Sequence, residues 1–290
     1  MDRSEVLKKI ELLDDYLHIK EFLKYIVDNR KKFDNEILYN AMAKAESISE
    51  DFKKEIFYED FYKNTLERYN QYINSKMILL ESQTFMMGSS KDSDQLYCGE
   101  IPKHEVFIDE FEISSFVVDA ELYNSFCGKK TEEVSSHMPA VDVSWYDAVM
   151  FSRWIGCRLP TEAEWELASG KLENSHWCCK EDELDRYAWY SENSQGCVHE
   201  IAKKAPNKYG LFDMLGNIWE WVMDSYDSAY YANSAKKNPV CNKITPYKSC
   251  RGGSIHAFSE MCRSEFRYNE PAYYRSSDLG FRVVRDNKFL

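Results

Sequence analysis

The N-terminal part of the chain lacks the residues that break helices. Glycine is absent from the first 87 residues and proline from the first 101. Apolar side chains recur there at three- and four-residue spacing, which favours two or three packed helices, the last over Ser49–Ile73. The whole chain has 290 residues, which suits two compact units. We therefore predict a small all-α helical domain over residues 1–76 and a second domain over residues 77–290.

The chain also lacks a basic run, a long apolar run and an apolar N-terminal segment. Its net charge is −12 and its isoelectric point is about 5.1, whereas nucleic-acid binding needs a basic footprint. A transmembrane helix needs ~20 mainly apolar residues, and a signal peptide needs an apolar core. We therefore expect a soluble, cytoplasmic protein that has neither nucleic acid nor a membrane as its partner.

Clustered metal ligands are scarce. The nine cysteines include no Cys-x-x-Cys pair, which argues against a zinc site. The six histidines are scattered, and His18 is the only one before residue 76. We expect most cysteines to be reduced and buried as small apolar side chains. The N-terminal helices are accordingly expected to bind a partner protein or to self-associate rather than to perform chemistry.

Composition changes near Met77, where glycine, proline and tryptophan become frequent and apolar runs become short. Alternating apolar residues predict a strand within Val106–Ser114. Short helices are predicted over Trp145–Trp154 and Thr161–Ser169. The threonine that opens the second helix can cap it, and Glu164 can complete a capping box. These elements predict an irregular α+β domain rather than a repeated βαβ unit.

Several short motifs follow one another in the second domain, each rich in glycine, proline, tryptophan or charged residues. They are Phe85–Ser89, Glu100–Val106, Met138–Ala148, Arg158–Glu166, Tyr209–Trp221, Arg251–Ser254 and Gly280–Val284. In this order, over most of residues 77–290, they resemble the formylglycine-generating-enzyme, or sulfatase-modifying-factor, family. The resemblance implies an irregular, loop-rich relative of the C-type lectin fold.

The resemblance breaks at the catalytic cysteines. Family enzymes oxidise a substrate cysteine with O₂ and copper(I), which two thiolates hold. These cysteines lie three and eight residues beyond the serine of the Gly-Gly-Ser motif, which places them here at Ala257 and Cys262. A three-residue deletion in the alignment would leave neither cysteine. Alanine cannot bind copper, so we do not expect copper as a cofactor, and the missing thiolate argues against an enzyme.

A structural calcium ion is a second expectation from the resemblance. The carboxylates of Asp213 and Glu220 and the carbonyls of Gly216 and Ile218 are hard oxygen ligands around a tight turn, as Ca²⁺ prefers. The corresponding positions in family enzymes hold calcium. The alternative is that Glu220 accepts hydrogen bonds from the backbone within a buried turn.

Another branch of this fold serves recognition: the target proteins of diversity-generating retroelements carry a similar C-terminal segment. We therefore expect a non-catalytic module that binds a protein or peptide through its C-terminal lectin-like face, where tyrosine and serine suit versatile binding. The candidate ligand-binding residues at the surface are Trp219, Ser254, His256, Phe258, Arg263, Arg267, Tyr268, Tyr273 and Tyr274.

Two alternatives remain open. One is a metal-dependent oxidase that uses Cys262, either formylglycine-type with His256 as a further copper ligand or of the non-haem iron type. The related sulfoxide synthases carry their iron on a histidine-rich N-terminal helical domain, for which residues 1–75 supply only His18. The other alternative is a scaffold without a ligand.

Overall fold

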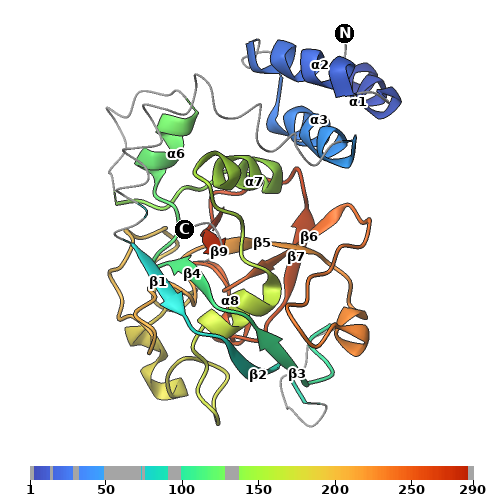
Figure 1. Ribbon diagram of the computed structural model, residues 1–290. Coiled ribbons are helices and arrows are strands. Elements are labelled where there is room, and N and C mark those ends of the chain that lie inside the picture. The colour runs from blue at the N-terminus through green and yellow to red at the C-terminus, as the bar shows by residue number, and fades with distance from the viewer. Residues whose placement is uncertain are drawn as a thin grey trace. The chain divides into compact units, whose positions relative to one another are not determined.

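The computed structural model describes residues 3–13, 16–28, 33–48, 73, 76–90, 99–127 and 137–286 (Figure 1). The chain divides into two compact units, Met1–Tyr72 and Ile73–Leu290. The helix predicted over Ser49–Ile73 lies, except for its last residue, outside the described residues. None of the described helices is long and apolar enough to span a membrane.

The first unit contains helices where the spacing of apolar residues predicts them. They are α1 (Arg3–Leu12), α2 (Tyr16–Asp28) and α3 (Asn35–Ile48). Asp34 caps α3, because its Oδ1 accepts a hydrogen bond of 3.0 Å from the Ile37 N–H. The buried side chains of the three helices, among them Val6 and Ile10, face one another as an apolar core.

The second unit is built from short strands in three sheets. A three-stranded antiparallel sheet has the order β1 (Met77–Leu80), β4 (Phe111–Ser114) and β9 (Val284–Asp286). A two-stranded sheet pairs β2 (Gln83–Met87) with β3 (His104–Ile108). The prediction of a single strand within Val106–Ser114 is wrong, because the strand is interrupted at residues 109–110 and β3 and β4 enter different sheets.

The third sheet carries the C-terminal motifs. Its order is β7 (Tyr268–Pro271), β6 (Tyr247–Arg251), β5 (Trp219–Ser225) and β8 (Leu279–Phe281). The pairing of β5 with β6 is antiparallel and that of β5 with β8 is parallel. The segment between β6 and β7 includes the single turn of 3₁₀ helix η4 (Ser259–Cys262).

Both helices predicted in this unit form. They are α7 (Trp145–Trp154) and α8 (Glu162–Ala168), and a third helix, α6 (Ala120–Phe126), precedes them. The predicted capping box of α8 is present: the Glu164 N–H donates to Thr161 Oγ1 at 3.2 Å, and the Thr161 N–H donates to Glu164 Oε2 at 2.8 Å. These two hydrogen bonds fix the start of the helix at its N-cap residue, Thr161.

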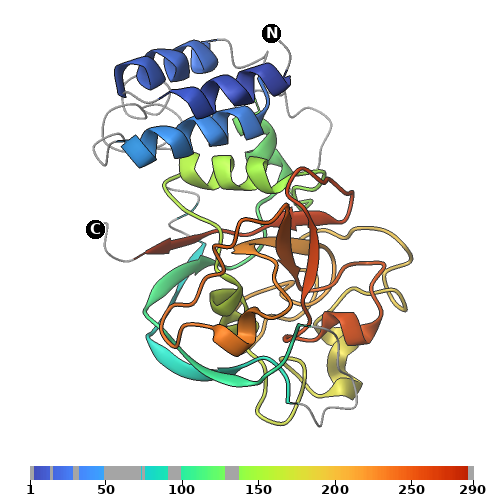
Figure 2. The same cartoon turned by 90° about the vertical axis from the view of Figure 1, so that its right-hand side faces the viewer.

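Helix α8 lies inside the second unit rather than on its surface. It contacts β2, β3, β5 and β6, and every residue of the helix is buried (Figures 1 and 2). Trp165 is completely buried, and its indole N–H donates to Glu220 Oε2 at 2.9 Å. A buried helix that carries carboxylates needs cationic partners, and the C-terminal segment supplies them.

Candidate functional site

A buried ionic framework joins α8 to the segment that follows β6. Glu162 accepts from Arg267 Nε at 2.7 Å and Nη2 at 2.8 Å, and from Arg251 Nη1 at 3.3 Å. Arg251 also donates to Glu166 at 2.6 Å. Burial opposes ionisation of Glu162, but the two guanidinium groups outweigh it and hold the pKa of this carboxyl below its ordinary value. Glu162 therefore carries its negative charge between two buried guanidinium groups.

An ion pair between Arg263 and Glu100 fixes the same segment at another point. Arg263 donates to both oxygens of Glu100, at 3.0 Å and 2.9 Å, and both side chains are completely buried. Ser89 Oγ adds a hydrogen bond of 3.2 Å to this carboxylate. The parallel two-bond geometry restricts the orientation of the arginine. The chain between β6 and β7 is thus held at Arg251, Arg263 and Arg267.

Four of the nine expected surface residues lie inside the domain, so their assignment to the surface is wrong. Arg263 and Arg267 point inward because buried carboxylates are their partners. Ser254 is 1 % exposed, and Trp219 is 8 % exposed because the Tyr268 ring stacks on it with centroids 4.8 Å apart. These four side chains therefore pack inside the domain, below the exposed residues of the same region.

The other five expected residues are exposed. Phe258 is 60 % exposed and Tyr273 67 %, and both protrude from loops beside η4 and β7. The exposed five, which we call the C-terminal aromatic face, are His256, Phe258, Tyr268, Tyr273 and Tyr274.

The candidate catalytic cysteine is closed off from solvent. Cys262 ends η4 and is 0 % exposed, and burial raises the pKa of its thiol to about 12. Its sulfur packs against Gly253, where a Cβ would lie 2.5 Å from Sγ. Ala257 is buried too, whereas its neighbour His256 is exposed. The thiol is therefore protonated near neutral pH, and it is not presented to a metal or a substrate.

We expect Cys262 to resist alkylation in the folded protein. At pH 8 a thiol with a pKa near 12 is ionised in about one molecule in ten thousand, and only the thiolate reacts. Iodoacetamide followed by peptide mass mapping should modify the exposed Cys197 within minutes and Cys262 only after unfolding in urea. Modification of both at similar rates in the folded protein would restore the oxidase alternative.

The expected calcium ligands do not fit a calcium ion in this geometry. The Glu220 oxygens accept from Arg282 Nε at 2.7 Å, Arg282 Nη2 at 2.8 Å and the Trp165 indole N–H. Asp213 Oδ2 accepts from the Ala202 N–H at 2.7 Å, and only its Oδ1 lacks a partner. The arginine already supplies the positive charge. Elsewhere in the described residues, no three His, Cys, Asp or Glu side chains are grouped to hold a metal ion.

The fold and this framework define a class of protein: an irregular α+β domain whose C-terminal loops are fixed by buried arginine–glutamate pairs. A family model described as "Sulfatase-modifying factor enzyme 1-like domain" matches residues 62–287. The chain belongs to this family, so the resemblance predicted from the ordered motifs is confirmed.

Curated relatives of the chain are longer proteins. It is 28% identical to the serine/threonine-protein kinase pkn1 of Chlamydia pneumoniae, over 74% of this chain and 39% of the kinase. It is 32% identical to the formylglycine-generating enzyme of Streptomyces coelicolor, over 51% of this chain and 52% of the enzyme. The chain thus spans about two fifths to about half of the length of these relatives.

Solved structures confirm the fold class. Treponema denticola variable protein 1 aligns with a TM-score of 0.65 at 25% identity, over 72% of this chain and 94% of that one. PvdO from Pseudomonas aeruginosa aligns with a TM-score of 0.66 at 24% identity, with the same coverage of both chains. The second unit therefore has the lectin-like fold of formylglycine-generating enzymes.

Proposed function

We propose that the second unit is a recognition module that binds a protein or peptide through its C-terminal aromatic face. The observation that carries this proposal is the contrast within one segment. Arg251, Arg263 and Arg267 are buried in ion pairs, while aromatic side chains between and after them are exposed. The segment is therefore rigid at its base and aromatic at its surface.

This surface is suited to binding because its Tyr268 side chain is held in place before a ligand arrives. Tyr268 is fixed by its stacking on Trp219 and by a hydrogen bond of 2.8 Å from its hydroxyl to Glu270. Rigid aromatic side chains lose little conformational entropy on binding and dominate interface energies. The likeness to a protein named variable protein 1 agrees with a displayed surface that changes among relatives, as in a retroelement target.

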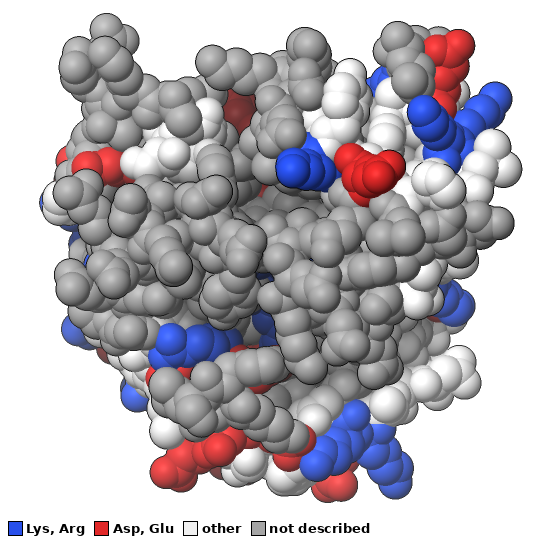
Figure 3. All heavy atoms as spheres, turned by 45° about the horizontal axis from the view of Figure 1, so that its top comes forward, with Lys and Arg blue, Asp and Glu red and all other residues white. Residues whose placement is uncertain are grey.

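The surface charge supports a protein or peptide as the partner rather than nucleic acid. Where Figure 3 shows described residues, lysine and arginine lie among aspartate and glutamate instead of forming one basic surface. The net charge of −12 would repel a phosphate backbone. We include in the proposal that residues 1–76 link this module to a partner protein or to a second copy.

The alternative is an oxidase that acts through Cys262. The similarity of the chain to formylglycine-generating enzymes favours this alternative. Two observations weigh against it: alanine occupies position 257, and Cys262 is a buried thiol whose pKa is raised to about 12 by burial. We therefore assign the segment to binding and not to cysteine oxidation.

Selection from a random peptide display library on the full chain tests the proposal. We expect enriched peptides whose affinity falls about tenfold or more in Phe258→Ala and in Tyr273→Ala, because each change removes a large exposed aromatic contact. Biolayer interferometry measures the affinities. Leu79→Ala is the matched control, since Leu79 is 48 % exposed but lies on β1.

Two results would contradict the proposal. One is that selected peptides bind Phe258→Ala and Tyr273→Ala as tightly as the natural chain. The other is conversion of a Cys-x-Pro-x-Arg peptide to its formylglycine product with copper and O₂, abolished in Cys262→Ala, which would establish the oxidase instead.

A further inference from the structure

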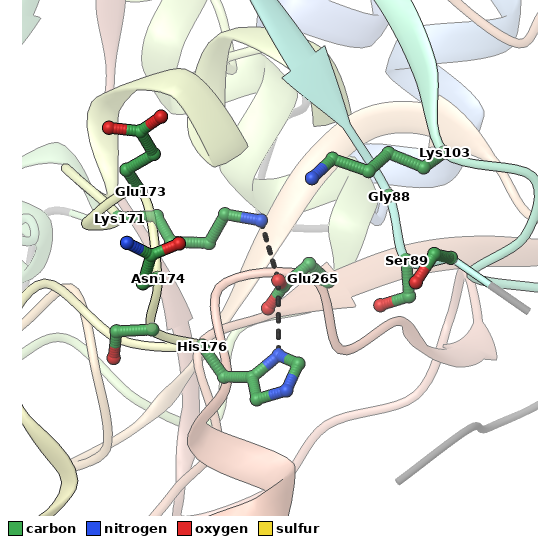
Figure 4. Close-up of a pocket in the computed structure, with 10 residues that line it drawn as sticks. Gly88, Ser89, Lys103, Lys171, Glu173, Asn174, His176 and Glu265 are labelled. Carbon is green, nitrogen blue, oxygen red and sulfur yellow. Dashed lines mark hydrogen bonds and ion pairs between the residues drawn. The ribbon is translucent and has the colours of Figure 1, made fainter. Parts of the chain in front are cut away.

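A charged pocket shares no lining residue with the C-terminal aromatic face. Its volume is about 210 Å³, and it is bounded by the end of β2, the residue Lys103 before β3, the stretch after α8 and Glu265. Figure 4 shows the ammonium groups of Lys103 and Lys171 pointing toward one another from opposite sides. The carboxylate of Glu173 points away from them. The function proposed above uses none of these residues.

Glu265 positions the groups on one side of the pocket. Its Oε1 accepts from Lys171 Nζ at 2.6 Å and lies 3.2 Å from His176 Nδ1, and its side chain is only 3 % exposed. Burial opposes ionisation of Glu265, but the His176 and Lys171 contacts outweigh it and lower its pKa. The Glu265 carboxylate thus contacts both Lys171 and His176. Lys103, in contrast, has no ion pair among the described residues.

The protein leaves polar atoms unsatisfied next to this pocket. Glu265 Oε2, Ser264 Oγ and Arg251 Nε are buried and lack a hydrogen-bond partner within the described residues. The three residues are neighbours, because Arg251 donates to the backbone oxygens of Ser264 at 2.7 Å and Glu265 at 3.2 Å. Buried polar atoms are normally satisfied by protein, ordered water or a ligand. Glu265 is the one of the three that lines the pocket, so its unpartnered oxygen is a place where a water or a ligand donor can bind.

We propose that this pocket binds the oxyanion group of a small ligand, a phosphate or a carboxylate, between Lys103 and Lys171. Glu265 already compensates the charge of Lys171, but an ammonium group has three N–H donors, so Lys171 can bind Glu265 and an oxyanion together. The oxyanion would also give Lys103 a counter-charge through a charge-assisted hydrogen bond. Ser89 lies on the side of Lys103 and Asn174 on the side of Lys171 (Figure 4), and Ser90 and Ser175 also line the pocket. At about 30 Å³ per water molecule, the volume corresponds to roughly seven waters, so it admits an oxyanion together with more of a small ligand.

Calorimetric titration of the full chain at constant ionic strength tests the site. The probes are inorganic phosphate and N-acetylglycinate, so that the two arms distinguish a phosphate from a carboxylate. We expect saturable binding with one ligand per chain for at least one probe. Lys103→Gln should weaken it roughly tenfold, because one charge-assisted contact is lost. Lys103 is exposed, so this change leaves the fold intact.

The matched control is Lys180→Gln, an exposed lysine of the same stretch that does not line this pocket. It should bind the probe as the natural chain does. Binding of one probe or of both upholds the proposal, provided that Lys103→Gln weakens it. Absence of saturable binding up to high millimolar probe, or equal weakening in the two variants, would overturn it.

Discussion

Replacement of Glu162 by glutamine is expected to destabilise the second unit by about 3–5 kcal/mol. The side chain is 1 % exposed and accepts hydrogen bonds from Arg251 and Arg267, which are also buried. Removing its charge leaves two fully buried guanidinium groups with one fewer counter-charge. An uncompensated buried charge costs far more than the same pair contributes at a surface. The loss should therefore be among the largest that a single side-chain change causes in this domain.

Urea unfolding followed by tryptophan fluorescence measures this effect. All seven tryptophans lie between residues 145 and 221, so the signal reports the second unit alone. Urea is preferred to guanidinium chloride because it does not screen charges. Glu183→Gln is the matched control: its partner Arg186 is 66% exposed and lies 3.4 Å away, so a change below about 1 kcal/mol is expected. A similar small loss for both variants would refute the role given to the framework.

Local features of this fold could be predicted from the sequence. The helix over Trp145–Trp154 and the capping box of Thr161 and Glu164 depend on residues three or four apart, so a short window contains all the information. The ordered motifs predicted the family, because their sequence order survives even where strands are too short to show periodicity. The division of Val106–Ser114 into β3 and β4 depends on which distant strands each of them pairs with. A short stretch of sequence does not contain this information.

The buried arginines were missed for the same reason. Arg263 pairs with Glu100 and Arg267 with Glu162, at separations of 163 and 105 residues. Arginine is usually exposed, so residue type alone predicts the surface. One signal was present: Glu162 and Glu166 are four residues apart on one face of a predicted helix whose other residues are largely apolar. A buried helix face with two carboxylates requires cations from elsewhere in the chain.

In the structure, the glycine of the turn expected to bind calcium is explained by a close approach of two backbone segments. At Gly216 the chain passes the backbone of Trp189, and a Cβ built on the glycine would lie 2.1 Å from the Trp189 oxygen. The neighbouring Asn217 N–H donates to that same oxygen at 2.7 Å, and the Gly216 N–H donates to the Gly252 oxygen at 2.7 Å. The glycine is therefore needed for a crossing of backbones, with a φ of +73° that other residues rarely adopt.

Gly216→Ala is accordingly expected to cost about 3–5 kcal/mol, or to prevent folding of the second unit. The cost has two parts: strain from a positive φ, and a clash with backbone atoms that cannot rotate away. Gly156→Ala isolates the first part, because Gly156 has a φ of +72° but nothing within 4 Å of its Cβ position. This control should lose about 1–2 kcal/mol in the same urea experiment.

The difference between the two glycine variants measures the close approach itself. If the turn serves this crossing, millimolar calcium should leave the stability of the natural chain and of Gly216→Ala unchanged. Glu220 is already paired with Arg282, so a cation would have to displace a buried guanidinium group. Equal losses in Gly216→Ala and Gly156→Ala would show that the Trp189 backbone can move aside. A calcium-dependent rise in stability, lost in Asp213→Asn, would return the turn to the role predicted from the family.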